Sequence, residues 1–394
     1  MLRRSHRKSR RGCLECKRRH VKCDERRPIC ILCTVSGRAC HYALESPLDN
    51  PSTPDTQTSP PSLVPDISFL ATAPAFPNAE SHESDPALDE PVNLNHMELL
   101  IHVTLDESLF GLGYQDANFP ANITTSLRIG LEAPYVLHEL LAFSARHLAF
   151  LHPERAASYL HQAVALQTRA VSLFNASWNG IDESNCVHML LFSACLGHHI
   201  LADTLAKRDA GGLEAFMLHF IQCLDMQRGV HAIAATAWPL LMESELKTIL
   251  SWSSQYNKRT PQGNHCQQVK ELIDGAKGLD EEEKEACQVA IRYLQIGFDS
   301  VFAEKEEERG NRFHMVHSWI LLISPPLRGL LVAKRPEALV LLGYYALLLH
   351  YGRHLWQIGD AGAFILGAVD DYLGPGWAHW LEWPREEVAK TLIA

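Results

Sequence analysis

The sequence predicts a small cysteine-rich module, a disordered linker and an all-α domain, in that order along the chain. Three observations lead to this prediction. Six regularly spaced cysteines lie within residues 1–42, ten of the 21 prolines lie within about residues 43–95, and apolar residues recur every three or four positions within about residues 96–394. The first part is too short to bury a core, whereas the third is long enough to bury a large one.

Charge is unevenly distributed over the 394 residues. Residues 1–42 contain 13 Lys and Arg against three acidic residues, although the whole chain has a formal net charge of −10. A basic head on an acidic body favours a head that binds a polyanion, and nucleic acid is the polyanion we expect. The N-terminus lacks the apolar core of a secretory signal, and no stretch reaches the roughly 20 apolar residues of a membrane span. We therefore expect an intracellular protein with reduced thiols and no membrane span.

The first six cysteines follow the spacing C-x2-C-x6-C twice, at Cys13, Cys16, Cys23, Cys30, Cys33 and Cys40. Clustered reduced thiols indicate metal, and Zn²⁺ prefers four tetrahedral ligands and binds thiolates well. Three cysteines per half are one short of such a site. Two Zn²⁺ ions need eight ligand positions, which six sulfurs can fill if two of them bridge. Because Cys13 and Cys30 occupy equivalent positions in the two copies, we expect them to be the bridging ligands. Metal binding should then supply about 10 kcal/mol or more of folding free energy per ion.

Residues 12–42, GCLECKRRHVKCDERRPICILCTVSGRACHY, resemble the fungal binuclear zinc-cluster family. The resemblance implies a sequence-specific DNA-binding transcription factor for RNA polymerase II genes, located in the nucleus or shuttling to it from the cytoplasm. In that family a short helix of the first half meets the major groove. Carried over by position, this helix begins after Cys13 and includes Glu15 to His20. The DNA-binding face is then formed by Lys17, Arg18, Arg19, His20 and Lys22.

Arg19 and His20 resemble the base-reading pair of the family. Arg19 can contact guanine O6 and N7 with two hydrogen bonds, whereas Lys17, Arg18 and Lys22 are expected to hold phosphates. His20 departs from the Lys or Arg that the family usually has there, which leaves the DNA half-site open. The basic arm of residues 1–11 either follows the DNA backbone, forms part of a nuclear import signal or is a solvated tail.

The linker, about residues 43–95, contains no Lys or Arg and is rich in Pro, Ser and Thr. Such a composition cannot bury enough apolar surface to offset its ordering entropy, so we expect disorder. Many family members continue from the cluster into a heptad coiled coil, but no such repeat appears here. A homodimer would therefore form through the helical domain. The acidic stretch of residues 39–127, which lacks Lys and Arg, is a candidate for recruiting the transcription machinery.

The third part is predicted to be a single all-α domain, because no alternating strand pattern appears in it. Two apolar stripes cover residues 137–151 and 159–174, and further helices are predicted at about 184–206, 213–228, 237–251, 281–303, 312–323, 336–351 and 361–373. Gly and Pro separate the segments, for example at Pro153, Gly211 and Pro325.

No catalytic motif is found in the helical part, so we expect no enzyme: it lacks the nucleophile elbow, the H-E-x-x-H zinc motif, the Walker loop and the dinucleotide fingerprint. His198 and His199 have no third ligand in the sequence and are interpreted as packing or surface residues. The tryptophans of the C-terminal tail, Trp377, Trp380 and Trp383, are interpreted as core residues. The remaining cysteines lack metal-binding spacing and are interpreted as buried thiols: Cys186, Cys195, Cys223, Cys266 and Cys287.

Three phrases of the helical part resemble the regulatory domain of sterol-uptake-control type zinc-cluster regulators. They are HMLLFSACLGHHILADTLA (188–206), FMLHFIQCLDMQRGVHAI (216–233) and LWQIGDAGAFILGAVDDYLGPGWAHWLEWP (355–384). The resemblance implies an all-helical domain that binds a lipophilic, sterol-like ligand, without assigning pocket residues. Two alternatives stay open. One is a pathway-specific regulator of a secondary-metabolite gene cluster, and the other is a lipid-binding sensor whose cysteine-rich module binds protein.

Overall fold

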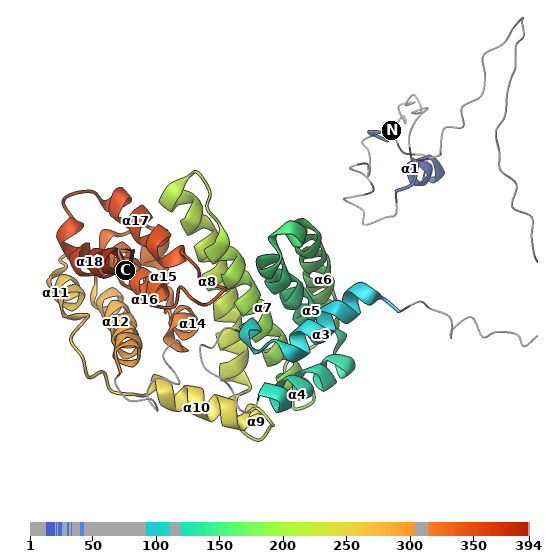
Figure 1. Cartoon of the computed structure of the whole chain (residues 1–394), viewed down its shortest axis with the longest axis horizontal. Helices are drawn as coiled ribbons and strands as arrows, with labels where there is room; N and C mark the ends of the chain where they lie inside the picture. The colour runs from blue at the N-terminus through green and yellow to red at the C-terminus, as the bar shows by residue number, and fades with distance from the viewer. Residues whose placement is uncertain are drawn as a thin grey trace, which may run out of the picture. The chain divides into compact units, whose positions relative to one another are not determined.

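A computed structural model describes residues 13–19, 21, 23–25, 30, 33, 40–42, 92–110, 119–303 and 314–392. The chain divides into two compact units, Met1–Glu83 and Ser84–Ala394. Residues 43–91 of the predicted linker lie outside the described residues. The second unit is helical, and its described residues contain no strand, which confirms the predicted all-α class (Figure 1).

The helical unit opens with helices that pack around α5. Asn93 caps the first helix, because its side chain accepts a hydrogen bond from the backbone N–H of His96 at 3.2 Å. Pro134 occupies the first turn of α5, where a missing N–H costs nothing. The elements are α3 (Leu94–Leu105), η2 (Glu107–Phe110), α4 (Phe119–Glu132), α5 (Pro134–Leu151), η3 (Pro153–Arg155) and α6 (Ala156–Ser177). The two predicted apolar stripes lie on α5 and α6, whose buried residues form shared clusters.

Helices α7 (Cys186–Ala206) and α8 (Gly212–Thr236) lie in the middle of the unit in Figure 1. Helix α7 packs against α5 on one side and α8 on the other. The turn between them uses Gly212 at φ +56°, a backbone conformation that favours glycine. The described residues show no clear membrane span: α7 is long and apolar enough to cross a bilayer, but 67% of that stretch is buried inside the unit, as in a core helix.

The prediction of a single helix at about residues 237–251 is wrong. The chain instead forms α9 (Trp238–Leu241) and α10 (Lys247–Asn257), with a turn between them. Ser244 explains the break, because its hydroxyl donates a hydrogen bond to the Leu241 carbonyl at 2.7 Å and accepts one from the Leu246 N–H at 3.2 Å. These local bonds compete with the helical pattern.

The last part of the unit packs around α16, whose residues from Glu337 to His350 are all buried. Glycine is required where α17 crosses α16, since a Cβ on Gly362 would lie 2.5 Å from both the Ala346 carbonyl oxygen and the His350 nitrogen. The elements are α11 (Gln267–Gly275), α12 (Glu281–Val301), α14 (His314–Leu321), α15 (Pro325–Val332), α16 (Pro336–Tyr351), α17 (Ala361–Leu373), η4 (Ala378–Leu381) and α18 (Glu382–Leu392).

Candidate metal centre and nucleic-acid interface

The first helix of the cysteine-rich unit, α1 (Leu14–Arg18), is short and begins directly after Cys13. The Cys13 sulfur caps it by accepting a hydrogen bond from the Cys16 N–H at 3.4 Å. The expected helix reached His20, but α1 ends at Arg18. Arg19 is its C-cap and donates its backbone N–H to the Glu15 carbonyl at 3.1 Å, and His20 lies outside the described residues.

The structure brings the six predicted sulfurs together in two overlapping groups of four. Within each group all sulfur atoms lie within 4.8 Å of one another, the groups being Cys13, Cys16, Cys23 and Cys30, and Cys13, Cys30, Cys33 and Cys40. The two residues common to both groups are Cys13 and Cys30, whose sulfurs are 3.7 Å apart. The Cys16–Cys30 and Cys13–Cys33 sulfur distances are 3.6 and 3.7 Å. Tetrahedral zinc with bonds of about 2.3 Å sets its sulfurs about 3.8 Å apart, so both groups have room for the ion.

Backbone N–H groups point at the sulfurs in the same way in both halves. The Cys13 N–H donates to the Cys23 sulfur at 3.5 Å, and the Cys30 N–H donates to the Cys40 sulfur at 3.4 Å. A third donor is the N–H of Glu25, a residue in the left-handed region at φ 58°, which lies 3.4 Å from the Cys23 sulfur. Hydrogen bonds to the charged form stabilise a thiolate, which is the form that binds metal.

Tyr42 is a neighbour of the metal centre that sequence reasoning missed. Its hydroxyl lies 3.7 Å from the Cys23 sulfur, and burial raises the pKa of the phenol, so it stays protonated and can donate to that sulfur. Burial also raises the pKa of the Cys33 thiol to about 12. A zinc ion offsets this cost by stabilising the thiolate, which couples metal binding to folding of the unit. The one sequence signal for Tyr42 is that an aromatic residue follows Cys40, the last cysteine of the module, by two positions.

Three of the five predicted DNA-binding residues are described. Lys17 and Arg18 lie on the last turn of α1 and Arg19 follows it, and all three are exposed. Arg18 forms an ion pair with Glu15 one turn earlier at 2.8 Å, while its side chain keeps 72% of its surface exposed. A pair of this kind contributes little stability, so Arg18 can exchange Glu15 for a phosphate. His20 and Lys22 lie outside the described residues.

The interpretations of the helical part can also be compared with the structure. All five cysteines of that part are buried, which confirms them as buried thiols. Trp377, Trp380 and Trp383 are partly buried against the main core, as expected. His199 is buried and its Nδ1 lies 2.9 Å from Oε1 of the buried Glu139. The His198 ring packs against His317, with centroids 4.7 Å apart. Both histidines therefore have packing roles in the domain.

Comparison with known proteins places this module in a class. Residues 11–48 match the fungal Zn(2)-Cys(6) binuclear cluster domain. A Zn(2)-C6 fungal-type transcription factor of Gibberella zeae is 23% identical over 97% of this chain and 86% of its own length. The Zn(2)-C6 fungal-type transcription factor afumD of Aspergillus fumigatus is 32% identical over 39% of this chain and 36% of its own length. Sterol uptake control protein 2 of Candida albicans is 54% identical over 12% of this chain and 7% of its own length.

A cysteine module of this class binds two zinc ions, and the sulfur groups described above are arranged to hold them. Residues 11–48 therefore form a domain of the fungal binuclear zinc-cluster class, and the chain is similar to fungal Zn(2)-C6 transcription factors. These findings support a DNA-binding transcriptional regulator. Except for the Gibberella protein, these relatives are matched over little more than a third of their length or less.

Proposed function

We propose that this chain regulates RNA polymerase II genes in the nucleus by zinc-dependent binding to a specific DNA sequence. The observation that carries the proposal is the basic end of α1, held next to two overlapping four-sulfur groups. All six cysteines act as zinc ligands, with Cys13 and Cys30 bridging. Arg19 and His20 read bases, and phosphates are held by Lys17, Arg18 and Lys22. Because metal would fix α1, Lys17 and Arg18 on its last turn would lose little entropy on binding beyond that of their own side chains.

Replacement of Arg19 by Ala tests the base-reading role. We expect binding to the preferred DNA site to weaken by about 1–3 kcal/mol and the preference at one base pair to relax, because a contact to guanine is lost. The matched control is Lys17→Ala, which removes a phosphate contact. It should weaken binding evenly across sequences and lower the salt slope by about one. Site selection from randomised DNA followed by titration at several salt concentrations measures both. An even loss across sequences for Arg19→Ala would instead make Arg19 a phosphate ligand.

A role in sensing a sterol or another lipid is a second proposal. Its support is the resemblance of three helical phrases and the match to a sterol uptake control protein, which covers 48 residues of this chain. The helical domain would then bind the lipophilic ligand. Mapping the full-length protein on chromatin separates this proposal from its alternative. Occupancy at sterol synthesis and uptake genes supports the lipid role, whereas occupancy confined to one cluster of biosynthetic genes makes the protein a pathway-specific regulator.

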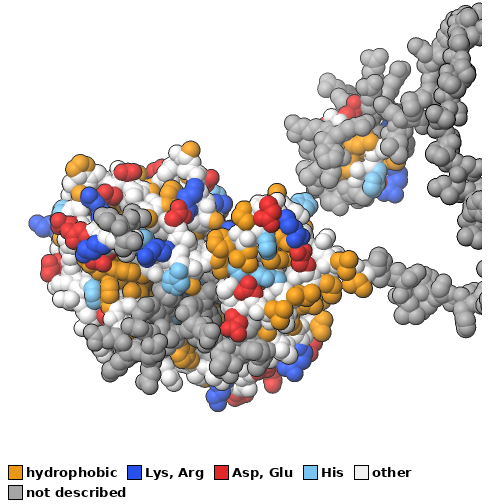
Figure 2. Space-filling view, in the orientation of Figure 1, with side chains coloured by type: hydrophobic (Ala, Val, Ile, Leu, Met, Phe, Trp, Pro, Cys, Tyr) orange, Lys and Arg blue, Asp and Glu red, His pale blue; other side chains and the backbone are white. Residues whose placement is uncertain are grey.

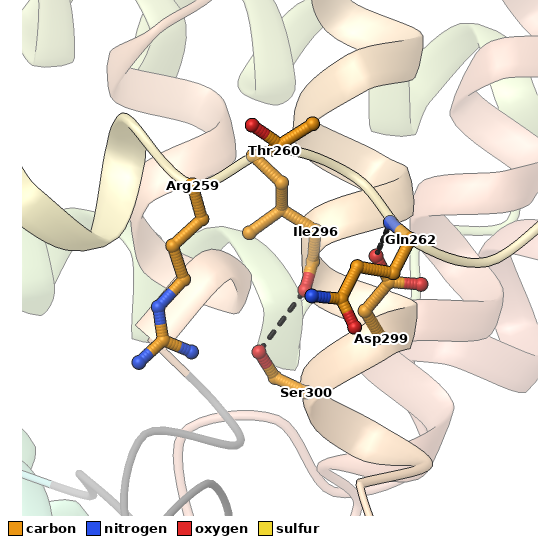
Figure 3. Close-up of a pocket in the computed structure, with 6 residues that line it drawn as sticks. All are labelled: Arg259, Thr260, Gln262, Ile296, Asp299 and Ser300. Carbon is orange, nitrogen blue, oxygen red and sulfur yellow. Dashed lines mark hydrogen bonds between the residues drawn. The ribbon is translucent and has the colours of Figure 1, made fainter.

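One pocket of about 380 Å³ formed by described residues has charged and polar side chains in its lining, which does not favour a lipid in it (Figure 3). It is lined by Arg259, Thr260, Gln262, Ile296, Asp299 and Ser300. Within it the Gln262 backbone N–H donates to the Asp299 carboxylate at 2.7 Å, and the Ser300 hydroxyl donates to the Ile296 carbonyl at 3.0 Å. Its charged and polar groups suit a polar molecule better than a sterol.

We propose that the helical domain binds a second copy of the chain and that this homodimer forms through α3. Leu94, Met97, Ile101 and Leu105 follow a three- and four-residue spacing along α3, and each is between 39% and 76% exposed. Figure 2 shows hydrophobic side chains along this helix. A row of apolar residues at this spacing can pack against its own copy around a two-fold axis.

Charge placed on this row should separate the dimer. We expect Ile101→Glu to shift the full-length protein from dimer to monomer in sedimentation velocity, because two carboxylates would be buried at the axis. Asn95→Glu adds the same charge to an exposed position of α3 outside the row and should leave the dimer intact. A wild-type protein that sediments as a monomer, or an Ile101→Glu dimer, would rule out α3 as the interface.

A further inference from the structure

Two histidines and one aspartate meet at the junction of α3, η2 and α5, far in sequence from the cysteine module. His102 lies in the last turn of α3, Asp106 is the C-cap of that helix, and His147 lies on α5. One donor atom of each residue lies within 4.8 Å of the other two. The closest approach is between His102 Nε2 and His147 Nδ1, at 3.1 Å.

The spacing of these residues suits a metal ion. His102 and Asp106 are four positions apart, so both lie on one face of α3 and its cap, as paired ligands on a helix do. Nitrogen ligands about 2.0–2.1 Å from tetrahedral zinc lie about 3.3 Å apart, close to the 3.1 Å between the two imidazoles.

The Asp106 carboxylate is held in place by Ser108. One carboxylate oxygen, Oδ1, accepts hydrogen bonds from the Ser108 backbone N–H at 2.9 Å and the Ser108 hydroxyl at 2.6 Å. The other oxygen, Oδ2, lies 3.8 Å from Nδ1 of His102, which is not the ring nitrogen that faces His147. Hydrogen bonds that orient a carboxylate in this way are typical of the groups around a metal ligand.

The donor set also matches a divalent cation. The three residues offer two imidazole nitrogens and one carboxylate oxygen, with one donor atom of each residue within 4.8 Å of the other two. Imidazole and carboxylate groups of this kind are ordinary zinc ligands.

The surroundings fix the buried side of the site and leave another side open. The His147 ring stacks on Trp356 at 4.5 Å between centroids, and the Trp356 indole N–H donates to the Leu109 carbonyl of η2 at 2.8 Å. His147 is 1% exposed, whereas the side chains of His102 and Asp106 keep 12% and 28% of their surface exposed. A solvent molecule can therefore reach the position opposite His147.

We propose that His102, Asp106 and His147 form a third zinc site, separate from the two zinc ions of the cysteine module. Zn²⁺ takes imidazole and carboxylate ligands, and a set of three protein ligands with water in the fourth position is one of its common arrangements. The ion ties α3, the first helix of the regulatory domain, to α5. This site does not depend on DNA binding. Evidence against a third zinc ion would therefore leave the proposed function of the cysteine module unaffected.

Zinc content of the full-length protein tests the site. Wild-type protein is equilibrated with Zn²⁺ against a weak competing chelator, and bound zinc is measured by mass spectrometry. We expect three zinc ions per chain for the wild type, and two for His147→Phe and Asp106→Asn. His161→Phe, which removes an exposed histidine of α6, should keep three. Because Asp106 is partly exposed, Asp106→Asn keeps the test valid if His147→Phe does not fold.

A second readout separates a bound ion from a hydrogen bond between the histidines. Removing zinc from this site should lower the melting temperature of the helical domain in the wild type and leave it unchanged in Asp106→Asn. A wild type with two zinc ions, or variants that hold as many zinc ions as the wild type, would overturn the proposal. DNA binding by Asp106→Asn should equal that of the wild type, because the cysteine module keeps its own ions.

Discussion

Cys30→Ala should remove two zinc ions from each chain and abolish specific DNA binding. Cys30 belongs to both four-sulfur groups, so its loss leaves three sulfurs in each, and neither group can then close a tetrahedral thiolate site. The unit has almost no other core, since its buried described residues are cysteines. Loss of the metal should therefore unfold the unit, because each structural zinc supplies about 10 kcal/mol or more of its folding free energy.

Two further cysteine variants sharpen this prediction. Cys16→Ala removes a ligand from one group only, so it should release fewer zinc ions than Cys30→Ala while still abolishing DNA binding. Cys186→Ala removes a buried thiol of the helical domain and should change neither zinc content nor DNA affinity. Mass-spectrometric zinc counting and DNA titration of the full-length chain measure both effects. Specific DNA binding by Cys30→Ala with reduced zinc would refute the shared-ligand arrangement.

His199→Leu should destabilise the helical domain by about 1–3 kcal/mol, the usual cost of leaving a buried polar group without its hydrogen-bond partner. Its partner Glu139 is fully buried on α5, 2.9 Å from His199 Nδ1, and loses this hydrogen bond in the variant. The double variant Glu139→Leu, His199→Leu should recover most of the loss, because replacing both partners by apolar groups leaves no buried polar group unsatisfied. Thermal or denaturant unfolding of the three proteins measures the difference. Equal stability of His199→Leu and the wild type would contradict the prediction.

The pH dependence of His199→Leu follows from the same pair. Burial raises the pKa of Glu139 above its ordinary value of 4.5, so the folded state binds a proton more tightly than the unfolded state. The protonated form therefore favours folding, and stability is lost as the pH rises through the folded-state pKa. In the variant the hydrogen bond between His199 and the Glu139 carboxylate is gone, so its stability deficit should be smaller at acidic pH than at neutral pH.

The metal centre could be predicted closely from the sequence. The physical reason is that the number and spacing of the cysteines determine how many sulfur ligands each zinc ion can have. Two copies of C-x2-C-x6-C require shared sulfurs, and the two groups do overlap at Cys13 and Cys30. Helices with long apolar stripes, such as α5 and α16, could also be predicted. The break between α9 and α10 could not, because the bonds of Ser244 compete with the helix only through local geometry.

The features missed by sequence reasoning depend on contacts between distant segments. Helices α11 and α15 are nine and eight residues long, too short for a periodic pattern to stand out. Glu139 and His199 are 60 positions apart, and His102 and His147 are 45 positions apart. Only packing of α3, α5 and α7 brings these partners together, so no spacing rule could identify them.

The overlap of the two sulfur groups has a consequence for how the protein responds to metal supply. With Cys13 and Cys30 as bridging ligands, we expect the first ion to order two of the four ligands of the second. We then expect the second ion to bind more tightly than the first, so that half-filled wild-type modules are rare at equilibrium. Under this expectation, the fraction of chains able to bind DNA should rise steeply over a narrow range of zinc concentration rather than in proportion to it.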